Sequence, residues 1–143
     1  MKKLFLFGGL LLLFACKKSP ISEESLKYLN GYWEISEVVF SDGTKKSYTV
    51  NPTVDFIQLE NNEGFRKKMQ PKFDGTYKTS GDIHDAELLQ VSRTDSDFVL
   101  RYSNEFSDRE EVLTHLDSIS FSVMGDDGNL YTYKRFQPII LPK

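Results

Sequence analysis

The sequence predicts an all-β protein, an antiparallel up-and-down meander of strands that closes into an eight- to ten-stranded barrel after a short N-terminal helix. Residues 31–40 are dense in β-branched and aromatic side chains and hold the only tryptophan, Trp33. Further strand-like segments recur with short turn signals between them, as in sandwiches and barrels. Rolling such a meander closed removes the exposed strand edges that invite aggregation, which favours a barrel.

The chain begins with a segment typical of a signal peptide, residues 1–15. Lys2 and Lys3 give a basic start, and residues 4–15 form an apolar run. A membrane-spanning helix needs about 20 apolar residues, so this run is too short for one and suits a signal-peptide core. The run ends in Leu13-Phe14-Ala15-Cys16, which resembles the lipobox of bacterial lipoproteins.

That resemblance implies that Cys16 is acylated and becomes the first residue of the mature protein. Residues 16–22, which include Pro20, would then form a lipidated tether. Two or more acyl chains hold a protein stably on a membrane, so we expect anchoring in the bacterial cell envelope, at the outer membrane. An ordinary secretory signal with an incidental cysteine is the alternative. The chain has one cysteine, so it forms no internal disulfide.

The first expected element of the mature chain is a short helix over residues 22–31. Ser22 can cap it, two glutamates follow in its first turn, and Asn30-Gly31 can end it. In the strand that follows, period-two alternation places Trp33, Ile35 and Val39 on one face and Val38 on the other.

The remaining elements follow in order after a polar connection over residues 45–52. Glycine, proline, asparagine and aspartate mark the breaks between strands. In the segment from Ser118 to Val123, serines alternate with apolar residues, which indicates one wet face and one buried face. Residues 108–116 also suit a helix. The expected strands are 54–60, 64–70, 73–79, 86–93, 97–103, 110–116, 118–124 and 129–136.

Composition favours one globular domain, residues 23–143, which we expect to be monomeric. The net charge of the whole chain is −3, and removal of Lys2 and Lys3 makes it −5. A weakly acidic globule argues against nucleic acid as a partner, because binding to phosphates needs clustered positive charge.

The two ends of the domain carry a family likeness. Gly31-Tyr32-Trp33 resembles the Gly-X-Trp opening of lipocalins, and Arg135 resembles the basic residue that covers the tryptophan from their last strand. The segments 74–78 and 131–135 resemble small lipocalin-like lipoproteins of bacterial envelopes. The resemblance implies a meander barrel that sometimes holds a small apolar molecule. It also gives Trp33 and Arg135 a structural role, in contact at one end of the barrel.

No catalytic residue, cofactor or metal site is expected. Asp82, His84 and Asp85 have ligand-like spacing, but one histidine with two loop carboxylates makes a poor closed site. His115 is expected to be an ordinary strand residue. A nucleophile elbow of the Gly-X-Ser-X-Gly type is absent from the sequence. The sequence therefore does not predict an enzyme.

The candidate ligand lining consists of residues that alternation places on inward faces. In the basic run from Arg66 to Lys68, Lys67 shares a face with Phe65 and could pair with a ligand carboxylate. A solvated edge guarded by lysines is the alternative for this run. The inward apolar residues could line a cavity or fill a packed core. The complete candidate set is Ile35, Phe65, Lys67, Phe98, Leu100, Phe121, Val123, Tyr131 and Tyr133.

These observations lead to a hypothesis of a lipid-anchored envelope protein that binds a small hydrophobic molecule in its barrel without catalysis. The alternative is a filled barrel that acts as a protein-interaction module.

Overall fold

The computed structural model describes residues 20–79, 81, 85–139 and 141–142, so residues 1–19 with Cys16, and Asp82 and His84, lie outside it. The described part holds one short 3₁₀ helix and ten strands. Their bounds are η1 Glu23–Leu29, β1 Gly31–Val39, β2 Lys45–Ser47, β3 Val54–Glu60, β4 Glu63–Pro71, β5 Tyr77–Thr79, β6 Ala86–Thr94, β7 Asp97–Ser103, β8 Asp108–Leu116, β9 Ser120–Gly125 and β10 Leu130–Arg135.

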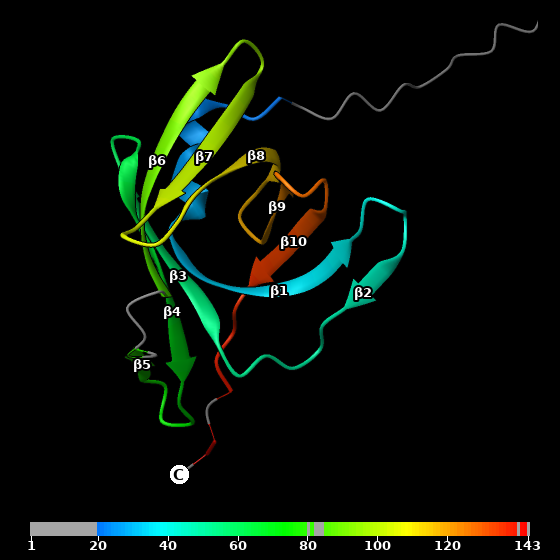
Figure 1. The fold of residues 1–143 in the computed structure, drawn as a ribbon. Coiled ribbons are helices and arrows are strands. Elements are labelled where there is room, and N and C mark those ends of the chain that lie inside the picture. The colour runs from blue at the N-terminus through cyan, green and yellow to red at the C-terminus, as the bar shows by residue number, and fades with distance from the viewer. Residues whose placement is uncertain (1–19, 80, 82–84, 140, 143) are drawn as a thin grey trace, which may run out of the picture.

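Eight of the strands form a closed antiparallel barrel. Their order is β10-β9-β8-β7-β6-β4-β3-β1, and β1 also pairs with β10, which joins the two ends of the sheet. Figure 1 shows β1 and β10 side by side although they come from opposite ends of the chain. The short strands β2 and β5 lie outside this ring and pair antiparallel with β1 and β4, respectively. The predicted fold class is confirmed by these pairings.

Most predicted strands are present, with some corrected bounds. Residues 108–116 form a strand and not a helix, because β8 pairs with β7 on one side and β9 on the other. The expected strand 73–79 shrinks to β5, since residues 73–75 form a turn in which Gly75 has a φ of +84°. Strand β9 starts at Ser120, so Ile119 lies in the preceding turn and is exposed. Ser122 was expected on the solvent-facing side of its strand, but it is buried. A hydrogen bond of 2.9 Å joins its hydroxyl to the hydroxyl of Thr132.

A bulge in β1 changes which side chains face inward. Ile35 pairs with Tyr133, but Glu37 pairs with Thr132, so the register shifts at Ser36. The extra residue reverses the alternation. Val38 is therefore buried, opposite Tyr131, whereas Val39, which was predicted to share a face with Trp33, is only half-buried.

Helix η1 covers one end of the barrel, which we call the closed end. Ser22 caps it by accepting a hydrogen bond from the Ser25 backbone. Leu26 and Leu29 are buried and join the apolar core with Trp33. Burial of these apolar side chains stabilises the fold by about 25 cal/mol per Å² of apolar surface removed from water. The described residues include no helix long and apolar enough to cross a membrane.

Candidate ligand site at the open end

The opposite end, which we call the open end, lies beside residues 104–107 and 126–129, the turns that follow β7 and β9. The strand β1 pairs with β3 only from Gly31 to Trp33. Beyond that point β1 pairs with β2 and β10 but no longer with β3, so β1 and β3 move apart toward the open end. Figure 1 shows β1 and β2 diverging from β3 and β4.

Most of the predicted lining residues do face inward, but they form packed core. Phe98, Leu100, Phe121 and Val123 are at most 3% exposed. Phe121 packs edge-on against Trp33 at 4.8 Å and stacks on Tyr133 at 4.7 Å between ring centroids. Ile35 and Tyr131 are half-buried and pack against the same cluster. Most of these apolar residues therefore fill the closed-end half, whereas Tyr131, at the start of β10, lies toward the open end.

Phe65 and Lys67 do not line the interior, which corrects the prediction. Arg66 lies opposite Ile57, which is fully buried, so Arg66 points into the barrel and its two neighbours point out. Phe65 instead packs on Phe56 outside the barrel, with ring centroids 5.9 Å apart. The apolar side chain of Phe65 suggested an inward position, but it is accommodated by packing on the outer face.

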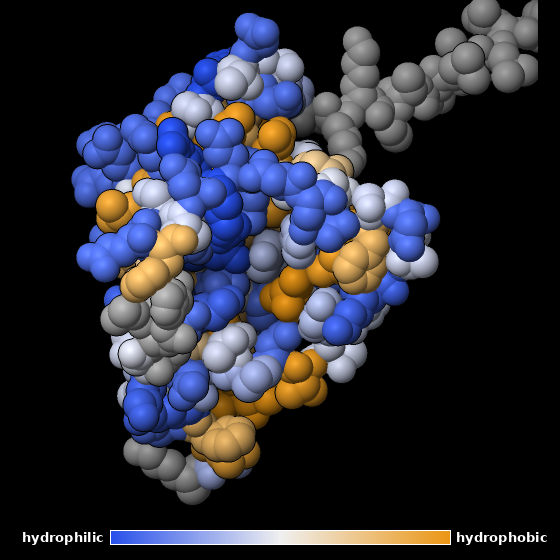
Figure 2. Space-filling model, in the orientation of Figure 1, coloured by the Kyte–Doolittle hydropathy of each residue, from blue (hydrophilic) through white to orange (hydrophobic). Residues whose placement is uncertain are grey.

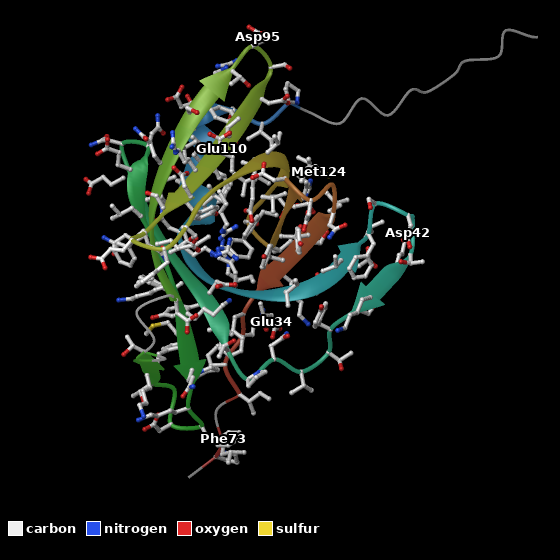
Figure 3. The ribbon with its side chains drawn as sticks, in the orientation of Figure 1. Glu34, Asp42, Phe73, Asp95, Glu110 and Met124 are labelled. Atoms are coloured by element: carbon white, nitrogen blue, oxygen red, sulfur yellow. The ribbon has the colours of Figure 1, made fainter. Side chains whose placement is uncertain are left out.

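Arg66 belongs to a chain of alternating charges inside the open end. Its Nη2 donates to Asp55 Oδ2 at 3.0 Å, and Lys68 Nζ donates to Asp55 Oδ1 at 3.1 Å. Nitrogen atoms gather inside the ring of strands in Figure 3. On its other side Arg66 lies 3.9 Å from Glu111 Oε2. Arg109 then links Glu111 to Glu87.

Arg109 makes a two-pronged contact with Glu87. Its Nε donates to Glu87 Oε2 at 3.0 Å and its Nη2 to Oε1 at 2.8 Å. Its Nη1 donates to Glu111 Oε1. The Arg109 guanidinium also lies over the Tyr102 ring, 4.3 Å from its centroid. Charged and bidentate bonds of this kind fix geometry strongly, so the open-end interior is rigidly organised.

The buried ionisable groups stabilise one another's charges. Burial raises the pKa of Asp55, but Arg66 and Lys68 outweigh burial and hold this pKa below its ordinary value. Burial lowers the pKa of Arg66, but Asp55, Tyr133, Tyr102 and Glu111 together outweigh burial and hold this pKa well above its ordinary value. The pKa of the Tyr102 hydroxyl is raised, chiefly because Tyr102 is buried. Asp55 and Arg66 are therefore both ionised at neutral pH.

A pocket of about 350 Å³ opens beside this chain. Its wall comes from the start of β8, the β9–β10 turn and two inward tyrosines of β10. Figure 2 shows a hollow in the same face of the molecule, where hydrophilic and hydrophobic colours meet, and Figure 3 labels Glu110 on β8. The lining residues are Arg109, Glu110, Glu111, Gly125, Asp126, Asp127, Tyr131 and Tyr133.

One atom of this site lacks a hydrogen-bond partner. Among the buried side-chain nitrogen and oxygen atoms of the described residues, Glu111 Oε2 lacks a hydrogen-bond partner. Arg66 Nη1 lies 3.9 Å away, which is close enough for an ion pair but too far for a hydrogen bond. Buried polar atoms are normally bonded, and leaving one unpaired costs about 1–3 kcal/mol. The site thus carries an unused acceptor.

Sequence reasoning missed the acidic partners of the charge chain. Glu111 and Arg109 share the inward face of β8 with Leu113, at period two. The sequence did hold a signal for them, because charged residues occur at period two on the same strand face as buried apolar residues. Asp55 stands in the same relation to Ile57 on β3.

The remaining candidate residues form no second site in the described chain. His115, in β8, contacts Asp117 Oδ2 at 2.9 Å and Ser120 Oγ at 3.1 Å through Nε2. The described residues contain no group of three or more His, Cys, Asp or Glu side chains placed to hold a metal ion. The candidate cluster near Asp85 lies mostly outside them.

No family model matches this chain, and no curated protein matches it. It is similar to a solved structure, a lipocalin-like protein from Bacteroides uniformis, with 12% sequence identity and a TM-score of 0.47. The match covers 76% of this chain and 99% of that one.

Proposed function

We propose that this protein is a monomeric, lipid-anchored envelope protein that binds a small molecule, without catalysis, at the open end of its barrel. The observation that carries the proposal is the division of the interior. A packed core fills the closed end, whereas the other end holds the pocket of about 350 Å³ beside preorganised charges. This volume lies within the range of about 300–1,000 Å³ usual for small-molecule sites.

Such a ligand would have polar as well as apolar groups. The Tyr131 ring offers apolar contact, while Arg109 and Glu111 offer charge within the same pocket. A purely apolar molecule would remove water from these charged groups without offering them a new hydrogen-bond partner, which is costly. The geometry therefore favours a polar ligand over the wholly hydrophobic one expected from the sequence.

The anchor would lie at the end opposite the pocket. Ile21 packs against the apolar core, and with Pro20 it lines a shallow pocket beside Phe98 and Leu113 at the closed end. A tether that starts at Cys16 leads into this region. An acylated Cys16 would therefore hold the closed end toward the membrane and leave the open end accessible.

Native mass spectrometry tests the binding function. A chain that begins at residue 16 with Cys16→Ser keeps every described element and needs no detergent. We expect a co-purifying small molecule that is released on unfolding. We also expect that adding it back shifts the amide NMR signals of Glu111, Gly125 and Tyr131, but not that of Leu29. An unliganded mass, together with no shift at the open end on adding a small-molecule extract of the native cells, contradicts the proposal.

A groove on the outside of the barrel favours a second candidate function, protein interaction. This groove of about 520 Å³ has a mostly apolar wall that includes Phe65, Ala86 and the exposed Leu88. Exposed apolar patches often mark protein contacts. Hydrogen exchange in the presence of a bound protein would protect β4 and β6 in this case, and would leave the start of β8 unchanged.

A further inference from the structure

We infer that the open-end pocket selects an organic cation, a ligand whose ammonium group donates a hydrogen bond to Glu111. The inference rests on the proposed binding function and names the ligand class of the same site. Three independent features of the pocket carry it: the charge of its wall, the unused acceptor and the aromatic faces.

The first feature is the charge of the wall. Three carboxylates belong to the pocket wall, those of Glu111, Asp126 and Asp127, against the single guanidinium of Arg109. Glu110 also borders the pocket, but it alternates with the inward Arg109 and Glu111, so its carboxylate points outward, toward Arg101. Arg109 is already bonded to Glu87 and Glu111. The potential inside a narrow site lined by one sign of charge attracts the opposite sign, so this wall favours cations.

The second feature is the kind of hydrogen-bonding group that the interior lacks. Arg66 Nη2 donates to Asp55 and its Nη1 to Tyr102, so the inward basic residue already has partners. The unpaired buried atom is an acceptor, Glu111 Oε2, on a side chain that is 6% exposed. A ligand carboxylate would add another acceptor, whereas an ammonium supplies donors. The site therefore requires a donor, the opposite of a fatty-acid head group.

A small adjustment brings this carboxylate to the ligand. The terminal torsion of a glutamate is soft, and although turning the Glu111 carboxylate disturbs its bond from Arg109 Nη1, the ligand ammonium supplies a new charged bond to the same carboxylate. Because Arg109 contacts only Oε1, a donor entering from the pocket can engage the carboxylate while Arg109 keeps Glu87.

The third feature is aromatic. Tyr131 lines the same pocket from β10, beside Tyr133, whose ring already contacts Phe121 and the Arg66 guanidinium. The Tyr131 hydroxyl donates to Asp127, which fixes its ring at the rim. Aromatic faces attract cations, so the Tyr131 ring favours an organic ammonium over a neutral group of similar shape.

Three probes that share a phenyl ring and differ in charge test the inference. Phenethylamine is a cation at neutral pH, 2-phenylethanol is neutral and 3-phenylpropionate is an anion. Binding is followed by amide NMR shifts at Glu111, Gly125 and Tyr131 in the Cys16→Ser chain. We expect phenethylamine to bind at least tenfold more tightly than the other two.

Matched variants locate the contact. Glu111→Gln keeps the side-chain shape and should weaken phenethylamine binding at least tenfold while leaving 2-phenylethanol unaffected. Glu60→Gln, exposed at the end of β3, is the control and should bind like the wild type. Asp126→Asn at the rim should weaken amine binding about two- to fivefold, and it keeps the test available if Glu111→Gln fails to fold.

Three outcomes overturn the inference. If the anion or the alcohol binds at the open end as tightly as the amine, the cation selectivity is wrong while the proposed function stands. Equal amine binding by wild type, Glu111→Gln and Asp126→Asn removes the carboxylates from the site. If phenethylamine shifts no open-end signal, the ligand class is wrong, and native mass spectrometry decides the binding function separately.

Discussion

The guanidinium carbon of Arg135 lies 3.8 Å from the centre of the Trp33 ring, at the closed end of the barrel. Its Nη1 and Nη2 donate to the backbone carbonyls of Asn30 and Tyr28 at 2.6 and 2.8 Å, and its Nε to that of Ser118 at 3.2 Å. One side chain thus joins the last strand to the first strand, the helix end and the turn before β9.

Arg135→Ala should lower the free energy of unfolding by about 2–4 kcal/mol. The change removes a cation–π contact of about 0.5–2 kcal/mol and several charged hydrogen bonds to backbone carbonyls. The free energy of unfolding of Arg135→Lys should lie between those of the wild type and Arg135→Ala, because lysine keeps the charge but lacks the planar guanidinium. Urea denaturation followed by Trp33 fluorescence measures this. Arg93→Ala, an exposed arginine over Phe98, is the control and should cost less than 1 kcal/mol; an equal loss there would contradict the prediction.

Breaking the buried ion pair from one side should be costly. Asp55→Ala leaves Arg66 buried without its carboxylate, and such losses amount to about 3–5 kcal/mol. The double variant Asp55→Ala with Arg66→Met should lose less than the sum of the single changes, since it removes both charges. Chemical denaturation of all four proteins gives the coupling. Additive losses would show that the two charges do not depend on each other.

Acid should narrow the stability difference between the wild type and Asp55→Asn. The pKa of Asp55 in the folded protein lies below its ordinary value, so ionisation of Asp55 stabilises the fold at neutral pH. This contribution is lost as the pH falls from about 4, the unfolded pKa, through the lower folded pKa. Urea denaturation between pH 7 and pH 3 measures the difference. A difference that stays constant below pH 4 would remove Asp55 as the titrating group.

Gly64→Ala should be among the most damaging small changes, at about 3 kcal/mol. A Cβ at this position would lie 1.8 Å from the backbone carbonyl oxygen of Gln58, so strands β3 and β4 must separate. Gly43→Ala is the matched control. Its Cβ would meet nothing within 4 Å, and only its φ of +88° is unfavourable, at about 1 kcal/mol. Similar melting temperatures for both variants would contradict the clash.

Lipidation at Cys16 should decide where the protein fractionates. We expect the wild type with the membranes and Cys16→Ser in the soluble fraction, because loss of the acyl chains removes the anchor. Ser19→Ala should behave as the wild type. Mass spectrometry of the membrane-extracted protein should show an acylated N-terminus at residue 16, and a membrane-bound Cys16→Ser form would refute lipid anchoring.

Turn chemistry explains how much of the fold could be predicted. The bounds of β3 and β7 match the predicted strands, because Asn61-Asn62 and Thr94 to Ser96 are local breaks readable from sequence. The β1 bulge could not be predicted, since the pairing with β10 decides where an extra residue enters. Val38 and Val39 exchanged faces for this reason alone.

The site was harder to predict than the barrel. In a basic run, alternation gives two equally regular assignments, and only the opposing residue Ile57 selects Arg66 as the inward one. The contact between Trp33 and Arg135 was predictable because closure brings the ends of the meander together. The link from Arg66 to Glu111 was not, because β4 and β8 are distant in sequence and these side chains meet only inside the closed barrel.

Closure by β1 and β10 also sets the order of folding. Arg135 and Asn30, whose contact seals the barrel, are 105 residues apart in the sequence. Contacts between residues so far apart in the sequence have a large entropic cost of loop closure, which is incurred before the contact can stabilise the fold. Barrels of this topology therefore fold in milliseconds to seconds. During synthesis, Trp33 must wait for the last strand to emerge. Until Arg135 has been synthesised, the Trp33 ring lacks the side chain that covers it in the folded barrel.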